Sequence, residues 1–533
     1  MALKISENSA FAPLAHPVFR AIWIVEMVSN IGTWMQDVGA GWLMTNLSTS
    51  PMMVALVQAA TTFPMMLLAL PAGALADIVD RRHLLLSAQA WMLLTATALS
   101  VLTLLGMMTA PLLLVLTLCL GIGAAFSMPA WAAMMPDLVG PKELQAAVTL
   151  NGLAMNVSKA IGPALAGYIM AVTSPGAVFL LNALSFVGII VVLFRWKNPT
   201  KSSELPAERM LGAMRNGYRY VRHSQPMLAV MIRAGTFFIF ASASWALLPI
   251  LVKLGFHGGP GDYGMALGSV GVGAIASVFM LPSLRQRMST DLLKKACSTL
   301  YAATLALMAL APTLPWLYAT TLVAGMAWLG VMSTLQGAAQ KALPAWVRAR
   351  GLSMVMVMFM GGMAIGALLW GQLATHFSVA DALQIAAVGL ALSILATWRT
   401  KLIQMDDTDL TPSLHWPAPV VDKELDMYRG PALVTLAYTV DPVHLAKFLK
   451  LMQQQRVVRR RDGAFYWQLF QETADSHRYL ETFLFDSWLE HLRHHKRVTK
   501  TDRLLQDEII LCLADYSVPV VTHHLAVTDF GEL

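Results

Sequence analysis

Charged residues are scarce in this chain of 533 residues, since Asp, Glu, Lys and Arg make up only 13% of it while 56% is hydrophobic. A soluble globular protein is therefore excluded as a description of the whole chain. Only three cysteines occur, without a Cys-x-x-Cys pair, so neither a disulfide framework nor a cysteine-based zinc site is expected. The P-loop pattern G-x-x-x-x-G-K-[ST] is also lacking, so ATP bound in such a loop does not drive this chain.

We expect no removable signal peptide either. The first seventeen residues contain neither an apolar core nor a small-residue cleavage site, so we expect the N-terminus to stay in the cytoplasm. The net charge of +7 raises the question of nucleic acid, but the basic residues of the apolar part fall in short connections, where membrane topology accounts for them. No nucleic-acid partner is expected.

Long apolar runs fill the chain up to about residue 402. Each contains about 20 or more mostly apolar residues, the length that a helix needs to cross ~30 Å of hydrocarbon. The pattern predicts an all-α membrane part of about twelve transmembrane helices. The spans are expected near residues 18–46, 51–76, 83–108, 111–135, 143–173, 176–196, 226–254, 261–284, 291–311, 313–340, 350–376 and 379–402.

The basic residues of the connections predict the orientation. Every second connection carries Lys or Arg, including the long one at 197–225, whereas the alternate connections carry almost none, Lys253 being the nearest exception. By the positive-inside rule, both termini and residues 197–225 lie in the cytoplasm. The chain is thus predicted to be a multi-pass protein of the inner cell membrane, surrounded by lipid.

Two glycine motifs repeat each other. The fifth run contains AIGPALAG and the eleventh contains AIGALLWG, at corresponding positions. One such motif alone would be ordinary, because small residues are common in packed membrane helices. Together they predict two six-helix halves, the arrangement that surrounds a midplane site in secondary transporters. The glycines are Gly162 and Gly167 in the fifth run and Gly366 and Gly371 in the eleventh.

Residues 1–402 resemble the major facilitator superfamily. The connection 73–82 is similar to the family signature between the second and third spans, G-x-L-A-D-x-x-G-R-[KR], and departs from it at Asp80, where the family has glycine. The resemblance implies that this segment latches one conformation at the seam between the halves. The other reading is that it only satisfies helix ends and sets orientation. The matching residues are Gly73, Leu75, Asp77, Arg81 and Arg82.

The fifth run resembles the antiporter signature of the same family, G-x-x-x-G-P-x-x-G-G, through Gly162, Pro163 and Gly167. This likeness implies export by exchange against another solute, here protons. Gly73 and Gly167 are expected to allow close helix contact. Residues 29–36 further resemble the branch that contains siderophore exporters and macrolide-type efflux proteins.

Ionisable residues inside the apolar runs are candidates for function, because each costs at least ~2.5 kcal/mol at membrane depth. Glu26 and Asp37 lie eleven positions apart, which returns them to within about 20° of one helix face, with Asn30 between them. This polar stripe predicts a cavity wall. We hypothesise that Asp37 takes up and releases a proton, since desolvation favours its neutral form.

Two basic residues extend this expected cavity. Lys159 precedes the Gly-Pro of the fifth run, and its counterpart in the repeat is Met363, so the shared packing does not require the charge. Arg233 lies about seven residues into the seventh run, where it can sit deep or reach the cytoplasmic interface with its long side chain. The predicted proton and substrate cavity comprises Glu26, Asn30, Asp37, Lys159 and Arg233.

The chain changes character after residue 402. A polar linker at 403–430 leads into about 100 residues with the order strand, helix, strand, strand, helix, strand, which predicts a small cytoplasmic α+β domain of the ferredoxin-like type. Residues 488–502 resemble an appended dimeric domain, similar to antibiotic-biosynthesis monooxygenases, of some transporters in this branch. The resemblance implies a homodimer through 431–533, whereas the fold does not imply monooxygenase chemistry.

Three histidines share one predicted helix of this domain. His491 and His495 are spaced to lie on one face, as metal ligands can be, with His494 beside them. Because Arg493 and Lys496 adjoin them, we favour a solvated basic helix over a metal site. No metal and no cofactor is expected.

Three functions fit these features. The first is a proton-coupled secondary exporter of a small amphipathic molecule, such as a siderophore or drug, working by alternating access. The others are an enzyme anchored in the membrane and a ligand sensor, both acting through the C-terminal domain. Twelve spans far exceed the needs of an anchor, which favours the exporter. The expected domains are 1–196, a first half; 197–225, a central loop; 226–402, a second half; 403–430, a linker; and 431–533, the soluble domain.

Overall fold

The computed structural model describes residues 11–139, 143–196, 210–344, 346–398, 402, 409–413, 415–416, 426–514 and 519–525. The chain forms two compact units. The first, called the helical unit, comprises Met1–Ala207, Met231–Gly337 and Ser353–Leu402. The second, called the C-terminal unit, comprises Glu208–Val230, Ala338–Leu352 and Ile403–Leu533.

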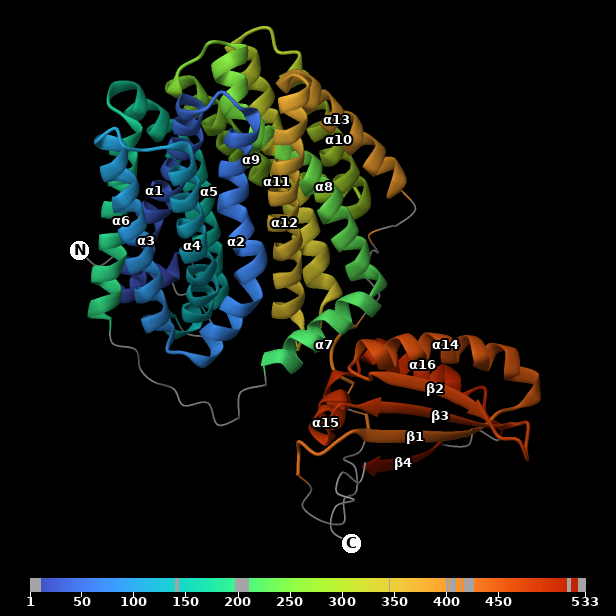
Figure 1. Cartoon of the computed structure of the whole chain (residues 1–533). Coiled ribbons are helices and arrows are strands. Elements are labelled where there is room, and N and C mark those ends of the chain that lie inside the picture. Colours follow the sequence, from blue (N-terminus) through green and yellow to red (C-terminus); the bar gives the residue numbers. More distant parts are fainter. Residues whose placement is uncertain are drawn as a thin grey trace. The chain divides into compact units, whose positions relative to one another are not determined.

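Twelve helices of 18 to 31 residues run through the described part of the apolar region (Figure 1). Four of them, α1, α2, α6 and α9, have proline as their first residue, where its missing N–H breaks no helical hydrogen bond. The bounds are α1 (Pro17–Leu47), α2 (Pro51–Ile78), α3 (Arg81–Leu104), α4 (Ala110–Leu138), α5 (Leu144–Val172), α6 (Pro175–Arg195), α8 (Gln225–Ile250), α9 (Pro260–Arg287), α10 (Thr290–Ala309), α11 (Leu314–Ala342), α12 (Arg348–His376) and α13 (Val379–Ala396), with the shorter η1 (Ala12–Ala15) and η2 (Leu251–Gly255).

Nine of the helices in the described part of the chain are long and apolar enough to cross a membrane. The remaining three are α1, α5 and α10, which carry ionisable residues such as Asp37, Lys159 and Lys294. The prediction of a mostly helical membrane protein is therefore confirmed. The number of twelve spans stays a prediction.

The first glycine of each repeated motif packs on the first helix of its own half. A Cβ on Gly162 of α5 would lie 2.6 Å from the Trp34 side chain of α1. A Cβ on Gly366 of α12 would overlap Ser242 of α8. Since α1 and α8 open the two halves of the sequence, the two motifs occupy equivalent positions.

The second glycine of each motif packs across to the other half. A Cβ on Gly167 of α5 would lie 2.8 Å from Cα of Gly264 in α9, the second helix of the second half. A Cβ on Gly371 of α12 would lie 2.5 Å from Ala55 in α2, the second helix of the first half. The halves are thus joined by two corresponding seams, α5 with α9 and α12 with α2.

The C-terminal unit contains a four-stranded antiparallel sheet in the order β2-β3-β1-β4. Helices α14 and α16 lie over one face of it (Figure 1). A small C-terminal sheet domain, predicted from the sequence, is therefore present. Its elements are β1 (Ala432–Thr439), η3 (Pro442–His444), α14 (Leu445–Arg461), β2 (Tyr466–Gln471), β3 (Arg478–Phe485), α15 (Trp488–Arg497), α16 (Lys500–Ile510) and β4 (Val520–Leu525), and α7 (Met210–His223) belongs to the same unit.

The strand register sets the core of this sheet. Val434 of β1 lies opposite Phe483 of β3 and, on its other side, opposite His523 of β4. Residues directly opposite each other in antiparallel strands project to the same face. Val434 and Phe483 are 2% and 1% exposed, so this is the face that the helices cover.

Candidate functional site

The polar stripe of α1 faces the interior of the helical unit. Ile24 and Val28, each two positions away from a stripe residue and so about half a turn around the helix, are 45% and 50% exposed. Glu26, Asn30 and Asp37 lie on the opposite, inner side. In the described part of the chain, neither carboxyl has a hydrogen bond or ion pair, and Nδ2 of Asn30 is buried without a partner.

Lys159 of α5 lies among three indole rings. Its Nζ is 5.5 Å from the ring centroid of Trp34 in α1, 4.7 Å from that of Trp245 in α8 and 5.4 Å from that of Trp328 in α11. Each ring face attracts a cation. The first tryptophan comes from the first half of the chain and the other two from the second half, so a single ammonium group connects both halves.

The sequence pointed to Lys159 but not to this set of rings. The three tryptophans come from runs far apart in the chain, and tryptophan is also common at membrane interfaces. The charge itself was the available signal, because a cation inside an apolar helix needs a compensating partner.

The halves close on each other at the end of the bundle away from the Lys- and Arg-rich connections, called the neutral end. Lys253 of η2 donates to the carbonyl oxygen of Thr45 over 2.6 Å and to Oδ1 of Asn46 over 2.7 Å, at the end of α1. Tyr263 of α9 stacks on Trp42 of α1, with ring centroids 6.1 Å apart. These contacts seal the neutral end.

The seam between α5 and α9 stops short of the opposite end, called the basic end. Beyond Gly167, the two antiparallel helices stay in contact at Gly268, whose Cβ would lie 3.3 Å from that of Ala164, and at Gly271, whose Cβ would overlap the Ala160 backbone. Seven residues make two turns, so the next pair on the same faces is Leu153 and Val278. These residues are 49% and 48% exposed, which shows that the helices no longer pack there.

The seam between α2 and α12 ends in the same way. Gly361 of α12 lies against Met66 of α2, its Cβ position 2.9 Å from the sulfur. The next pair, seven residues on, is Met354 and Gly73, yet within the described residues a Cβ on Gly73 would meet nothing within 4 Å. The close contact expected at Gly73 is therefore not formed in this structure, because both seams part toward the basic end, and it stays a prediction.

Arg233 does not belong to the group around Lys159. Its side chain is 1% exposed, makes an ion pair with Asp291 at the start of α10, and donates to the carbonyl oxygen of Thr397 over 3.1 Å. Trp245 lies twelve residues further along α8, about 18 Å away at 1.5 Å per residue. The placement of Arg233 in the cavity is therefore corrected: it ties α8, α10 and the end of α13 together near the basic end.

The connection between α2 and α3 satisfies helix ends. Asp80 is the N-cap of α3 and accepts from the backbone N–H of His83 over 3.0 Å, which lowers the pKa of its carboxyl. Arg82 donates to the carbonyl oxygens of Leu193 and Phe194 at the end of α6 over 2.8 and 2.6 Å. These contacts fit the alternative interpretation of the segment 73–82, in which it satisfies helix ends and sets orientation. The side chain of Asp77, the expected latch, lies outside the described residues.

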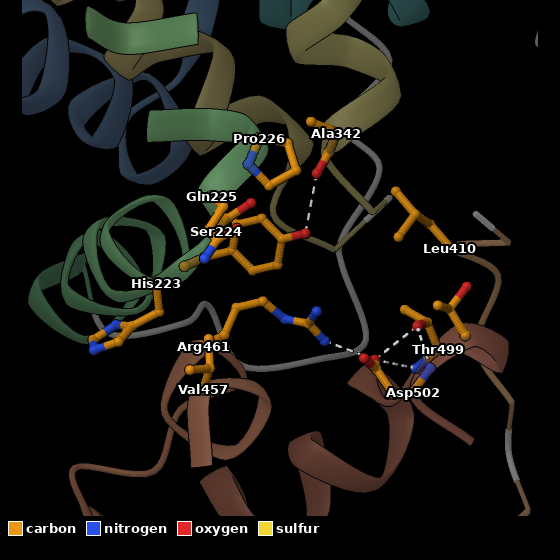
Figure 2. Close-up of a pocket in the computed structure, with 12 residues that line it drawn as sticks. His223, Ser224, Gln225, Pro226, Ala342, Leu410, Val457, Arg461, Thr499 and Asp502 are labelled. Atoms are coloured by element: carbon orange, nitrogen blue, oxygen red, sulfur yellow. Dashed lines mark hydrogen bonds and ion pairs between the residues drawn. The ribbon is translucent and has the colours of Figure 1, made fainter. Parts of the chain in front are cut away.

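The C-terminal unit contains a cavity of about 160 Å³ (Figure 2). Arg461 of α14 projects toward it and donates to Oδ2 of Asp502 over 2.6 Å, and its guanidinium lies 5.5 Å from the ring of Tyr220 in α7. The Tyr220 hydroxyl donates to the carbonyl oxygen of Ala342 over 3.0 Å. Asp462 accepts two further hydrogen bonds from Arg461. Because Arg461 is hydrogen-bonded to Asp462 and Asp502, we interpret this cavity as a structural junction.

A buried ion pair organises the sheet of the same unit. Glu481 of β3 is 0% exposed and accepts from Arg459 over 3.1 Å, from the Tyr438 hydroxyl over 2.7 Å and from Trp467 Nε1 over 2.8 Å. The guanidinium of Arg459 lies 4.4 Å from the ring of Phe483. Three side chains therefore donate to one buried carboxylate.

Replacing Glu481 with glutamine is expected to lower the opening free energy of β1 and β3 by about 3–5 kcal/mol, because it leaves the Arg459 charge buried without its counter-ion. Hydrogen–deuterium exchange of these strands in the full-length protein measures the change. Glu472→Gln is the control: that carboxylate is exposed and 3.7 Å from Arg478, so a change within about 0.5 kcal/mol is expected. Equal exchange in both variants would contradict the role of the buried pair.

The prediction of a solvated helix at His491–His495 is wrong. His491 and His494 are 1% and 0% exposed, because α15 packs this side on Phe485 of β3, with Trp488 of the same helix against His491. Burial lowers the pKa of His491 to about 3 and that of His494 well below its ordinary value. The prediction fails because Arg493 and Arg497 are paired with Glu490 of the same helix. Their charges therefore do not require this side of the helix to face solvent.

A family model described as "Transmembrane secretion effector", for transporters of the major facilitator type, matches residues 8–529 of the chain. The chain belongs to this family. It is therefore a multi-pass membrane transporter and not an enzyme. The expected resemblance to the major facilitator superfamily is confirmed at this level.

Curated relatives are similar at low identity. The enterobactin exporter EntS of Citrobacter koseri is 23% identical over 385 residues, which cover 71% of this chain and 90% of that protein. The staphyloferrin A transporter of Staphylococcus aureus is 26% identical over 259 residues, 48% of this chain and 64% of that protein. The macrolide efflux protein A of Streptococcus pyogenes is 25% identical over 248 residues, 45% and 60% of the two chains. The chain thus spans less than two thirds of the length of these last two relatives.

Solved transporters share the fold. A POT family transporter in complex with a thioalcohol-conjugated peptide aligns with a TM-score of 0.60 at 12% identity, over 71% of this chain and 95% of that chain. A bacterial homologue of the iron transporter ferroportin in an inward-facing state aligns with a TM-score of 0.56 at 15% identity, over 72% and 98%. At such identities the likeness concerns the fold alone.

Proposed function

We propose that this transporter is a proton-coupled exporter of a small amphipathic molecule, of the siderophore or drug type, and works by alternating access. The observation that carries the proposal is the position of Lys159 among indole rings from both halves. A ligand that displaces these contacts interacts with both halves at once. Binding at such a place biases the equilibrium between conformations, as alternating access requires.

The chemistry around Lys159 favours a ligand with an aromatic or apolar body and an anionic group. The indole faces offer apolar area to such a body. The Lys159 ammonium group can pair with the anionic group, because no acidic residue in the described part of the chain forms an ion pair with it. Relatives that transport staphyloferrin A, enterobactin and macrolides fit a role in small-molecule export. Transport assays with a panel of such compounds distinguish among these ligand classes.

The two seams suggest how access alternates. With all twelve long helices spanning the membrane and the basic connections in the cytoplasm, the sealed neutral end faces outward and the parted basic end faces inward. In the opposite state we expect Leu153 to approach Val278 and Gly73 to approach Met354. The close packing expected of Gly73 would then belong to that state, and Asp77 would act beside it.

The C-terminal unit is proposed to regulate transport as a ferredoxin-like domain of the monooxygenase-like type. Arg219 of α7 donates to the carbonyl oxygen of Gly463 over 3.0 Å and to Asp486 over 3.1 Å. Arg497 lies 4.4 Å from the ring of Trp346, in the connection between α11 and α12. The domain thus contacts α7, which precedes α8 in the chain, and the connection between α11 and α12. Self-association through 431–533 stays a prediction.

Transport by the purified protein in liposomes tests the proposal. With an imposed pH gradient, a panel of siderophores and lipophilic drugs is expected to include at least one compound whose movement is coupled to proton movement in the opposite direction. If folded protein moved none of them, or moved one without proton flux, exchange against protons would be contradicted.

Replacing Lys159 with methionine is expected to weaken binding of an anionic substrate by about 30-fold, because a desolvated cation contact of ~2 kcal/mol is lost. Lys159→Arg retains the charge and its attraction to indole rings, so most of the affinity should remain. The apparent KM of both variants in liposomes measures the difference. Equal KM values for wild type and Lys159→Met would contradict contact between substrate and Lys159.

A further inference from the structure

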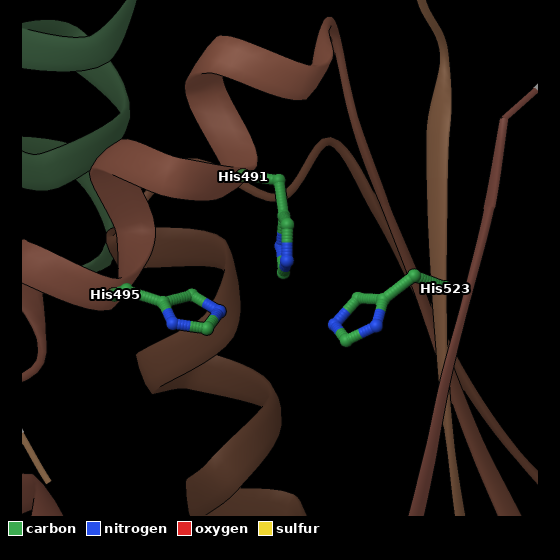
Figure 3. A group of neighbouring side chains, drawn as sticks. All are labelled: His491, His495 and His523. Atoms are coloured by element: carbon green, nitrogen blue, oxygen red, sulfur yellow. The ribbon is translucent and has the colours of Figure 1, made fainter. Parts of the chain in front are cut away.

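Three histidines gather at the edge of the sheet in the C-terminal unit (Figure 3). His491 and His495 lie one turn apart in α15, and their ring centroids are 4.7 Å apart. His523 lies in β4, with its ring centroid 4.8 Å from that of His491. One nitrogen of each ring lies within 4.8 Å of the corresponding nitrogens of the other two. Two elements far apart in the chain thus place three metal-binding groups together.

The sheet register explains why His523 faces the helix. It lies opposite Val434 of β1, which is buried on the helix-covered face. Its neighbour His524 lies opposite Leu433 and therefore projects to the other face. The position of β4 at the edge of the sheet leaves His523 and His495 half-buried, so an ion can reach them.

Packing alone does not explain why the polar side chain of His491 is buried. It is 1% exposed, and neither of its ring nitrogens has a hydrogen-bond partner among the residues that the structure describes. A neutral imidazole offers one donor and one acceptor, and leaving such a group buried and unsatisfied costs about 1–3 kcal/mol. The ring of Phe485, with its centroid 5.6 Å away, has no polar atom, and within the described residues Trp488, 5.0 Å away, makes no hydrogen bond to His491.

We propose that His491, His495 and His523 bind one divalent transition-metal ion of the zinc class. Imidazole suits such ions, and three protein ligands leave a fourth tetrahedral position open to water or another small ligand. At Zn–N distances of about 2.0–2.1 Å, tetrahedral nitrogens lie about 3.3 Å apart. The three nitrogens therefore need to approach one another by at most about 1.5 Å, a distance within reach of side-chain rotation at two half-buried residues.

The surrounding charges permit a cation. The nearby Arg459 is paired with Glu481, and Arg497 is paired with Glu490. These two guanidinium groups are thus compensated before the ion binds.

Zinc binding to the full-length protein, prepared without a polyhistidine tag and stripped of metal, tests the site. Competition with a chromophoric chelator should show one saturable equivalent of Zn²⁺ per chain. Loss of an outer partner of a ligand already weakens metal binding 10–100-fold, so His523→Ala should weaken it by about 100-fold or more. His524→Ala, on the opposite face of the same strand, should bind Zn²⁺ as the wild type does.

A second variant and a second readout guard against a folding defect. His495→Ala changes a half-buried helix residue and should lower the affinity as His523→Ala does. Zn²⁺ should also slow hydrogen exchange in α15 and β4 of the wild type and not of either variant, because an ion that binds only the folded form stabilises it. Absence of a saturable equivalent, or unchanged affinity in both variants, would overturn the proposal.

Discussion

Replacing Asp37 with asparagine is expected to abolish proton-driven export while leaving substrate exchange across the membrane intact. Asparagine has nearly the same shape but cannot carry a proton, so the inner stripe of α1 keeps its packing and loses its titration. With one proton exchanged per substrate, a pH gradient of one unit supports a substrate gradient of about tenfold. In Asp37→Asn liposomes this gradient should fall to about one. The measurement is substrate accumulation with and without the pH gradient.

Glu26→Gln is the matched control for this prediction. Glu26 lies on the same stripe of α1 but only six residues after Arg20, nearer the basic end. We expect Glu26→Gln to retain the tenfold gradient. If it lost the gradient while Asp37→Asn kept it, the proton would be assigned to Glu26 and the proposed role of Asp37 would be wrong.

Replacing Gly264 with valine is expected to lower transport by about 100-fold. A Cβ at this position would lie 2.6 Å from the carbonyl oxygen of Pro163 and 2.7 Å from Cα of Gly167, so α5 and α9 could not approach as they do. Overpacking of this kind costs about 3 kcal/mol, which reduces the population of the sealed state by about 100-fold. Initial transport rates, normalised to protein in the membrane, measure the effect.

Gly261→Val provides the control in the same helix. A Cβ on Gly261 would meet nothing within 4 Å, so the added side chain should leave transport within about twofold of the wild type. Strong transport by Gly264→Val would show that the sealed seam is not part of the cycle. A spectroscopic distance across the neutral end would show directly whether the seam has opened.

Helix positions and the repeat could be predicted from the sequence because they depend on local pattern. Runs of about 20 apolar residues must form helices in a membrane, since every backbone polar group needs an internal partner there. The glycine spacing at Gly162 and Gly167 reappears at Gly366 and Gly371, and both pairs make equivalent contacts. The strands of the C-terminal domain could likewise be located along the chain from short alternating segments.

Side-chain partners between distant segments could not be predicted. Arg233 could be deep or interfacial from its position alone, and only Asp291 of α10 decides its placement. The basic neighbours of His491 predict a solvated helix, because the partners of those neighbours are not visible in the sequence. The tryptophans around Lys159 come from three helices, and no local spacing connects them.

Cross-linking of Leu153→Cys with Val278→Cys, in protein whose Cys119 and Cys297 are replaced by serine, tests the alternation of the seams most directly. A disulfide needs Cα atoms within about 7 Å, which requires α5 and α9 to pack at the basic end. We predict that the cross-link forms in membranes, that it stops transport, and that a reductant restores transport. Failure of the pair to cross-link, or full transport by the cross-linked protein, would contradict alternation of the seams.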